Sequence, residues 1–438
     1  MKISTKPCQV SQIVCLTILL YLSASDLFGR IDFSLLVPGE MYDFVFLAIL
    51  LWSIADLKIK GNPIHKSINA LWPYFTLLIV AVIQGVFLQI KGTQGIGASL
   101  SVIRELLFIL IIYPFTAQNY NTRKVIKVLI VLDSIAALVY IVEMLYGGPI
   151  TGFQLHTSGF YEPIGSVYVW RAWSNSPLLA AFTAPFLFIM IIRKNPVFKS
   201  TLLDTFAFAL ICIGTVCRLG RMEIFTVACS CVLALLISDG KDYRKKLIHI
   251  LGICFAAVVS LAVMYVVANG FFVRLWNGVL GLINFADSSY DSTLSVRTIA
   301  VQTRIEYILS NSCAFFGVGP LHRDFNLMGL NTSIYDYANG GVLSSDSAYA
   351  TFLLRYGFVG TALYVLGLAL GGMKLIHGRT PAAIASGVYL FTRLLAGITG
   401  YESWGKHALL LIGMLVGVAI KDESGKGKKT DECYASDM

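Results

Sequence analysis

Residues 69–90 read NALWPYFTLLIVAVIQGVFLQI and contain no charged side chain. A helix of about 20 consecutive, mostly apolar residues crosses the roughly 30 Å of hydrocarbon in a bilayer. The stretch is therefore long and apolar enough for one crossing. We predict a transmembrane helix here, and this prediction sets the fold class for the whole chain.

Similar apolar runs recur along the sequence. Hydrophobic residues make up 56% of the chain and charged residues 13%, whereas soluble domains carry roughly 25% charged residues. A lipid-facing surface removes the need for charge on the outside of a protein. We predict an all-α polytopic integral membrane helical bundle with about twelve transmembrane helices. The expected spans are 9–28, 41–57, 69–90, 98–117, 126–146, 177–192, 201–217, 222–238, 247–268, 346–372, 382–399 and 406–420.

These spans divide the chain into parts. Residues 1–268 carry the earlier spans and an outer loop at 147–176, residues 269–345 form one large extracytoplasmic loop, and residues 346–420 carry the remaining spans. The polar residues 421–438 predict a disordered cytoplasmic tail.

Inside the large loop, the pattern over residues 292–312 predicts an amphipathic helix. Arg297 and Arg304 fall on one helical face together with Val301 and Ile308. Such a helix suits the membrane interface, where its apolar side chains are buried and its guanidinium groups stay in water or bind phosphate.

Loops that are rich in basic residues alternate along the chain with loops that are poor in them. The richer loops are those around Lys58, Arg123, Arg193, Lys245, Lys374 and Lys426. The positive-inside rule assigns the richer set to the cytoplasm. Both termini are then cytoplasmic, and the loops at 147–176 and 269–345 lie outside.

Several function classes find no support in the composition. The net charge of +9 is spread over short loops, so we predict no nucleic-acid partner. The nine cysteines include no CxxC pattern, and His156 and His322 are too scattered for a zinc site. We find no phosphate-binding loop and no dinucleotide fingerprint. We therefore expect neither a metal nor a cofactor.

The outer loops favour arginine, whose planar guanidinium binds phosphate or carboxylate through paired hydrogen bonds. Arg218 and Arg221 flank a tight turn that also holds Glu223, and Arg171 lies in the segment WRAWSNSP at 170–177. One interpretation is an anionic ligand on this side of the membrane. The alternative is anchoring to lipid headgroups, with Glu223 as an ion-pair partner.

Three short runs in the second half of the chain carry a family resemblance. Residues 315–320 read FFGVGP, residues 346–349 read DSAY and residues 356–360 read YGFVG. With the arginine-containing segments before residue 222, these runs resemble the O-antigen ligase/polymerase superfamily, most closely over 297–360. Ligases of this superfamily place a His-Asn pair where this chain has Asp346-Ser347. That departure favours a polysaccharide repeat-unit polymerase over a ligase.

The resemblance implies a metal-independent glycosyltransferase-type reaction at the outer face of a bacterial cytoplasmic membrane. Its substrates would be undecaprenyl-diphosphate-linked oligosaccharides among the membrane lipids, and a chain-length regulator is a further possible partner. The product would be a lipopolysaccharide O-antigen, a capsule or another surface polysaccharide.

The chemistry that the resemblance implies suggests roles for individual residues. Guanidinium groups would stabilise the leaving diphosphate, and a carboxylate would accept a proton from the acceptor hydroxyl or orient that hydroxyl. We expect Asp346, Arg297 and Arg221 to be catalytic. The alternative for Asp346 is that its carboxylate only caps the N-terminus of a helix. The predicted diphosphate-binding residues are Arg218, Arg221, Arg297, Arg304 and Arg171. The secondary candidates are Glu223, His322 and Arg355.

Three alternatives remain open at this point, and one of them is a purely structural or sensory membrane protein. A ligase would transfer the finished glycan to a lipid or protein acceptor. A transporter or flippase would move the lipid-linked unit, and it should show interrupted helices and matched halves. Charged residues within spans, such as Asp133 and Arg393, suggest either a substrate path or pairing inside the bundle, and we favour the pairing.

Overall fold

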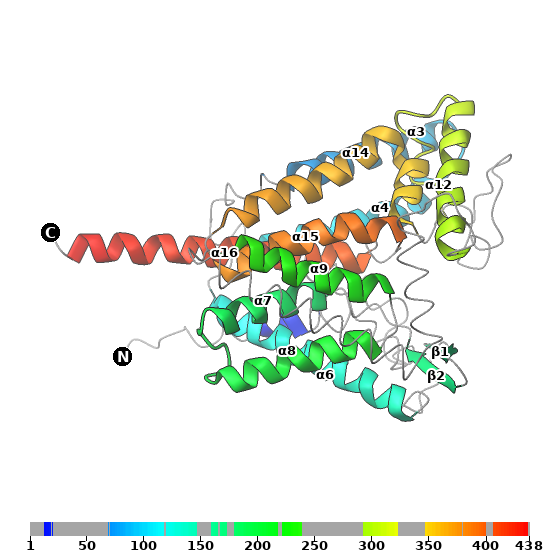
Figure 1. Cartoon of the computed structure of the whole chain (residues 1–438). Helices are drawn as coiled ribbons and strands as arrows, with labels where there is room; N and C mark the ends of the chain where they lie inside the picture. The colour runs from blue at the N-terminus through cyan, green and yellow to red at the C-terminus, as the bar shows by residue number, and fades with distance from the viewer. Residues whose placement is uncertain are drawn as a thin grey trace, which may run out of the picture.

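A bundle of long apolar helices makes up most of the described structure (Figure 1). The computed structural model describes residues 13–18, 20, 69, 71–117, 120–146, 159–164, 167–172, 179–217, 221–238, 292–322, 347–378, 380–399 and 406–436. The helices in chain order are α3 (Trp72–Ile90), α4 (Ile96–Leu107), the 3-10 helix η3 (Phe108–Ile111), α5 (Ile112–Ala117), α6 (Thr122–Tyr146), α7 (Ala180–Ile192), α8 (Thr201–Cys217), α9 (Arg221–Ile237), α12 (Ser292–Ser310), α14 (Ala348–Ile376), α15 (Pro381–Thr399) and α16 (Lys406–Ser436).

Four helical segments are long and apolar enough to cross a membrane: Trp72–Ile90, Ile96–Thr116, Thr122–Glu143 and Ala348–Ile376. The second of these combines α4, η3 and α5, so the expected span 98–117 contains a 3-10 stretch in its middle. Shorter apolar helices occupy the expected spans 177–192, 201–217, 222–238 and 382–399. The protein is therefore a helical membrane protein. The expected spans 41–57 and 247–268, and most of 9–28, lie outside the described residues.

Helix α3 shows why the bundle suits lipid. Pro73 lies at its start, where the missing amide hydrogen has no intrahelical partner to lose. Tyr74 and Leu77 face the interior, whereas Ile83 is half exposed and Ile90 is 74% exposed. A helix that is apolar on its outward face as well is stable when hydrocarbon covers that face.

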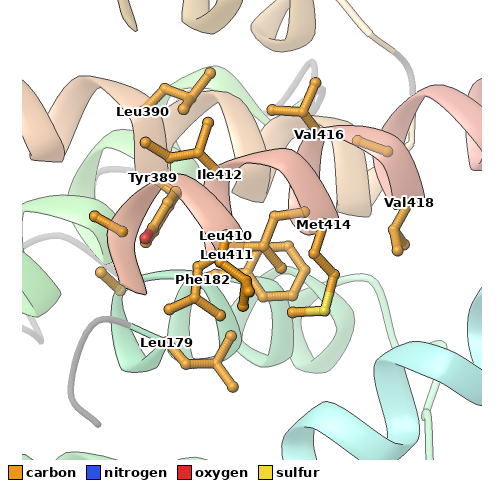
Figure 2. Close-up of a cluster of buried hydrophobic side chains, with 14 of the residues drawn as sticks. Leu179, Phe182, Tyr389, Leu390, Leu410, Leu411, Ile412, Met414, Val416 and Val418 are labelled. Atoms are coloured by element: carbon orange, nitrogen blue, oxygen red, sulfur yellow. The ribbon is translucent and has the colours of Figure 1, made fainter. Parts of the chain in front are cut away.

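Helix α16 lies at the centre of the bundle. Its residues from Ala408 to Ile420 are almost all fully buried, around the whole circumference of the helix. Figure 2 shows Leu410 and Met414 near Phe182 of α7, in the same cluster as Tyr389 of α15. The expected span 406–420 is thus a helix enclosed by protein.

Helix α16 continues beyond its buried part to Ser436 and projects from the bundle (Figure 1). Its first residues after the buried part have definite partners. The Asp422 carboxylate accepts a 2.6 Å hydrogen bond from the Thr122 hydroxyl, and Glu423 accepts a 2.6 Å bond from the backbone amide of Thr380. The polar segment expected at 421–438 therefore begins as an anchored helix, and the disorder of its remainder stays a prediction.

The described loops gather at two ends of the bundle. Arg123 donates to the carbonyl of Pro196, which joins the start of α6 to the turn between α7 and α8. The Asp422 and Glu423 contacts bring the starts of α6 and α15 to the same end. Basic residues of the predicted cytoplasmic set, such as Lys194, lie in these loops. These basic loops lie at one end of the bundle, as the predicted alternation of basic-rich and basic-poor loops requires. The assignment of this end to the cytoplasm stays a prediction.

The other end, called the α12 end below, carries α12, which lies crosswise to α14 and α15 (Figure 1). Of the loop expected at 269–345, residues 292–322 are described, and the predicted helix at 292–312 is observed as α12. The expected loop 147–176 contains two strands, β1 (Gly159–Ile164) and β2 (Val167–Ala172), which pair as an antiparallel hairpin beside α6. The all-α prediction missed this hairpin, because two six-residue strands, one of them containing Pro163, give a weak signal between long apolar runs.

Candidate functional site

Helix α14 is broken near the α12 end. Gly357 has φ 63° and ψ −162°, a backbone conformation that is essentially restricted to glycine. A break inside a helix leaves carbonyls before it and amides after it without their helical partners. In a candidate membrane span these groups must be satisfied by protein, because hydrocarbon offers no hydrogen bonds.

The loop 311–322, which follows α12, supplies those partners. The amides of Val318 and Gly319 donate to the carbonyls of Leu354 and Arg355, at 2.9 and 2.8 Å. In return, the amides after the break donate to the loop. Phe358 binds the carbonyl of Ala314 at 2.9 Å, and Val359 binds the carbonyl of Phe315 at 3.0 Å. The loop therefore completes the hydrogen bonding of the interrupted helix in both directions.

This exchange brings together two of the sequence runs on which the family resemblance depends. The run at 315–320 contributes Gly317, with φ 69°, and the run at 356–360 contributes Gly357. A Cβ atom on either glycine would lie within 2.6 Å of backbone atoms of the opposite run. Only glycine lets the two backbones approach this closely.

A second set of contacts holds the loop to α3 and to the turn that follows it. The Gln84 side chain donates to the carbonyl of Phe316. Gln94 donates to the carbonyl of Pro320 at 3.1 Å and accepts from the backbone amide of His322 at 2.7 Å. The loop is thus fixed between α3 and α14.

Helix α12 directs one face toward the bundle. Ala300, Arg304 and Ile308 are buried, and Arg297 is partly buried. Arg304 is only 1% exposed, and its Nη1 donates to the carbonyl of Ala300 at 2.9 Å. Ile308 belongs to a small apolar cluster with Leu354 of α14. The predicted shared face of Arg297, Arg304 and Ile308 is confirmed, although Arg304 is buried in protein where we expected a solvated interfacial residue.

Helix α14 contributes a second buried guanidinium group. Arg355 is 6% exposed and lies directly before the buried Tyr356. A buried charge is costly unless it is paired or hydrogen-bonded, so Arg355 marks a polar position inside an otherwise apolar helix.

Two ionisable groups on α12 and in the loop after it are neutral. Burial raises the pKa of the Tyr307 phenol and of the Cys313 thiol. Both groups then stay protonated near pH 7.

The remaining candidates lie on other elements. Arg221 is the first residue of α9, and Glu223 lies in the first turn of that helix. Arg171 is on β2, opposite Phe160 of β1. Arg218 and Asp346 lie outside the described residues. The structure therefore brings Arg297, Arg304 and Arg355 onto two helices that pack together, and it leaves Arg171 and Arg221 on separate elements.

The N-terminal cap of α14 bears on the role of Asp346. Ser347 has the extended backbone of a cap residue, and its hydroxyl accepts from the amide of Ala350 at 3.5 Å. A helix N-terminus needs one such cap. The capping function that was the alternative interpretation of Asp346 is therefore performed by its neighbour.

Charged residues deeper in the bundle are paired internally. The Asp133 carboxylate in α6 accepts from the Thr183 hydroxyl of α7. The Arg393 guanidinium lies 5.1 Å from the centre of the Tyr389 ring, a favourable cation–π distance. These contacts agree with the predicted interior pairing.

Within the described ranges, histidine, cysteine and acidic residues form no group of three that could hold a metal ion.

Sequence reasoning missed the roles of Gln84 and Gln94. Amides inside or beside apolar runs give no periodic signal, although an amide within a span is itself a sign of a polar partner.

Comparison with known proteins adds no family assignment, since no protein-family model matches the chain and no curated protein is significantly similar to it.

Proposed function

We propose that this membrane protein is a polymerase that joins undecaprenyl-diphosphate-linked oligosaccharide repeat units into a surface polysaccharide. The proposal rests on the placement of Arg297, Arg304 and Arg355 on two packed helices at one end of the bundle. Guanidinium groups held rigidly in a medium of low dielectric constant stabilise a leaving diphosphate far better than mobile surface arginines do.

The proposed reaction is a glycosyl transfer. A hydroxyl of the incoming repeat unit attacks the anomeric carbon of the growing chain, and the bond from that carbon to the diphosphate oxygen breaks. The departing diphosphate gains negative charge, which Arg297, Arg304 and Arg355 would balance. Asp346 would accept the proton of the hydroxyl or orient it.

The broken helix α14 also deserves comparison with a transporter, since interrupted helices are typical of transporter binding sites. In a transporter the freed backbone groups face a substrate or ion. In this protein the amides of Phe358 and Val359 and the carbonyls of Leu354 and Arg355 bind the loop 311–322. The break therefore supports a structural connection, and it gives no support to a transport site.

One experiment distinguishes the proposed polymerase from its alternatives. The gene is deleted in its host, and surface glycan is separated on a gel by chain length. A polymerase predicts lipid-linked or surface glycan one repeat unit long, with the long ladder lost. A ligase predicts long glycan on its lipid carrier with none attached to the acceptor. Unchanged glycan would refute both enzymatic hypotheses.

A further inference from the structure

The loop 311–322 reaches far down the sides of two candidate membrane spans. Phe316 accepts a hydrogen bond from Gln84, and α3 ends at Ile90. At 1.5 Å per residue, Gln84 lies about 9 Å inside the end of α3. Phe316 is therefore level with a turn of α3 that a span of this length places below the membrane surface.

The contacts with α14 give the same level independently. The loop binds the backbone of α14 from Leu354 to Val359, whereas α14 begins at Ala348. These bonds lie about 9–16 Å from the start of that helix. Both α3 and α14 are apolar enough to cross a membrane, so the loop lies beside the interior portions of two such helices.

The side chains at this level face outward and are aromatic. Phe315 is 71% exposed and Phe316 is 54% exposed. Ile83 and Phe87 of α3 and Phe358 of α14 are also exposed large hydrophobics. A phenyl ring in water costs about 1.5–3 kcal/mol relative to an apolar environment, so a loop that tolerates two exposed phenylalanines has its favourable environment in hydrocarbon.

Much of the backbone of the loop is hydrogen-bonded to protein. Irregular backbone at membrane depth is tolerated where protein satisfies its polar groups. The amides of Gly317, Val318 and Gly319 all donate to protein carbonyls. The carbonyls from Cys313 to Phe316 accept from Gly317, Phe358, Val359 and Gln84 respectively.

We infer that residues 314–319 form a re-entrant segment that lies within the hydrocarbon region, where Phe315 and Phe316 contact the acyl chains of bilayer lipids. The chain enters the membrane after α12, inserts into the break of α14 and leaves again toward His322. This inference changes the expectation that residues 269–345 form a loop entirely outside the membrane. It does not depend on the proposed polymerase activity.

Spin-label accessibility tests the inference on the full-length chain. The nine cysteines are replaced by alanine, and Phe315→Cys and Phe316→Cys are each labelled with a nitroxide in phosphatidylcholine–phosphatidylglycerol vesicles. Collision rates are measured with oxygen, which concentrates in hydrocarbon, and with a nickel chelate, which stays in water. Phe87→Cys on α3 is the lipid control, and Ser310→Cys is the water control at the exposed end of α12.

The expected ratio of oxygen to nickel collisions at positions 315 and 316 matches that of Phe87→Cys and exceeds that of Ser310→Cys several-fold. A ratio equal to that of Ser310→Cys would place the segment in water and overturn the inference. Low collision rates with both reagents would mean that other protein covers the two side chains, and this result would overturn it equally. Using two neighbouring exposed positions guards against local distortion at either one, and size-exclusion elution of each labelled variant confirms that it is folded.

Discussion

Gly317 and Gly357 are packed backbone to backbone. A Cβ on Gly317 would lie 2.6 Å from the amide nitrogen of Gly357, and a Cβ on Gly357 would lie 2.6 Å from the amide nitrogen of Gly317. Both residues have positive φ. The contact fastens the loop after α12 to the broken helix α14, and so it fixes the spacing between the helices that carry Arg304 and Arg355.

Gly317→Ala and Gly357→Ala should each destabilise the protein strongly. The left-handed conformation costs an alanine about 1–2 kcal/mol, and forced overpacking adds about 1–3 kcal/mol. The midpoint of thermal unfolding in detergent measures the effect. Gly92→Ala is the matched control, since Gly92 has φ 66° with no atom near its missing side chain. If Gly317→Ala lost no more stability than Gly92→Ala, close packing at this contact would be disproved.

Gln94 should control the order of the loop near His322. Gln94→Ala removes the acceptor for the His322 amide and the donor to Pro320, so hydrogen exchange of residues 313–322 should speed up. Gln94→Glu keeps the acceptor oxygen and should leave the His322 amide protected. Mass spectrometry of proteolytic fragments measures both variants. Equal exchange in the two variants would show that the acceptor contact does not hold the loop.

The arginines of the α12 end should matter for long glycan. Replacing Arg297, Arg304 or Arg355 by alanine should reduce polymer formation by about 10²–10³-fold, the loss that follows removal of one charge-stabilising donor. Gel ladders of surface glycan at matched membrane levels of protein measure this. Arg123→Ala, an exposed arginine at the opposite end, should leave the ladder unchanged. Full-length polymer from the Arg297 and Arg304 variants would refute the proposed diphosphate contact.

The acidic residues after the buried part of α16 should stabilise the bundle. A chain that ends after Ser424 keeps the Asp422 and Glu423 acceptors, whereas a chain that ends after Lys421 loses both. We expect the shorter chain to lose about 2 kcal/mol, roughly 1 kcal/mol for each lost contact at a helix start. Thermal unfolding of the two truncated proteins compares them directly. Equal midpoints would show that these contacts contribute nothing.

Much of the helical fold could be predicted from hydropathy, because apolar length alone identifies a span. Helix α12 and its arginine face were also predictable, since helical periodicity places Arg297 and Arg304 together. The sequence pattern could not show that α16 is enclosed. A helix that is apolar all round suits the centre of a bundle as well as it suits lipid.

The connection between Gly317 and Gly357 was beyond sequence reasoning for a different reason. In a sequence, a single glycine inside an apolar run indicates only that the helix is less stable at that position. It does not indicate which distant residue packs against that glycine. The burial of Arg304 was also hidden, because periodicity identifies a shared face but does not say what covers that face. Exposed arginines and buried arginines look the same in a single sequence.

The central place of α16 has a consequence for how the protein is made. The elements η3, α5 and α15, which pack on its buried part, all precede it in the chain. During synthesis these elements are therefore made before the helix that fills the space between them. The bundle can close around its centre only after α16 has been translated.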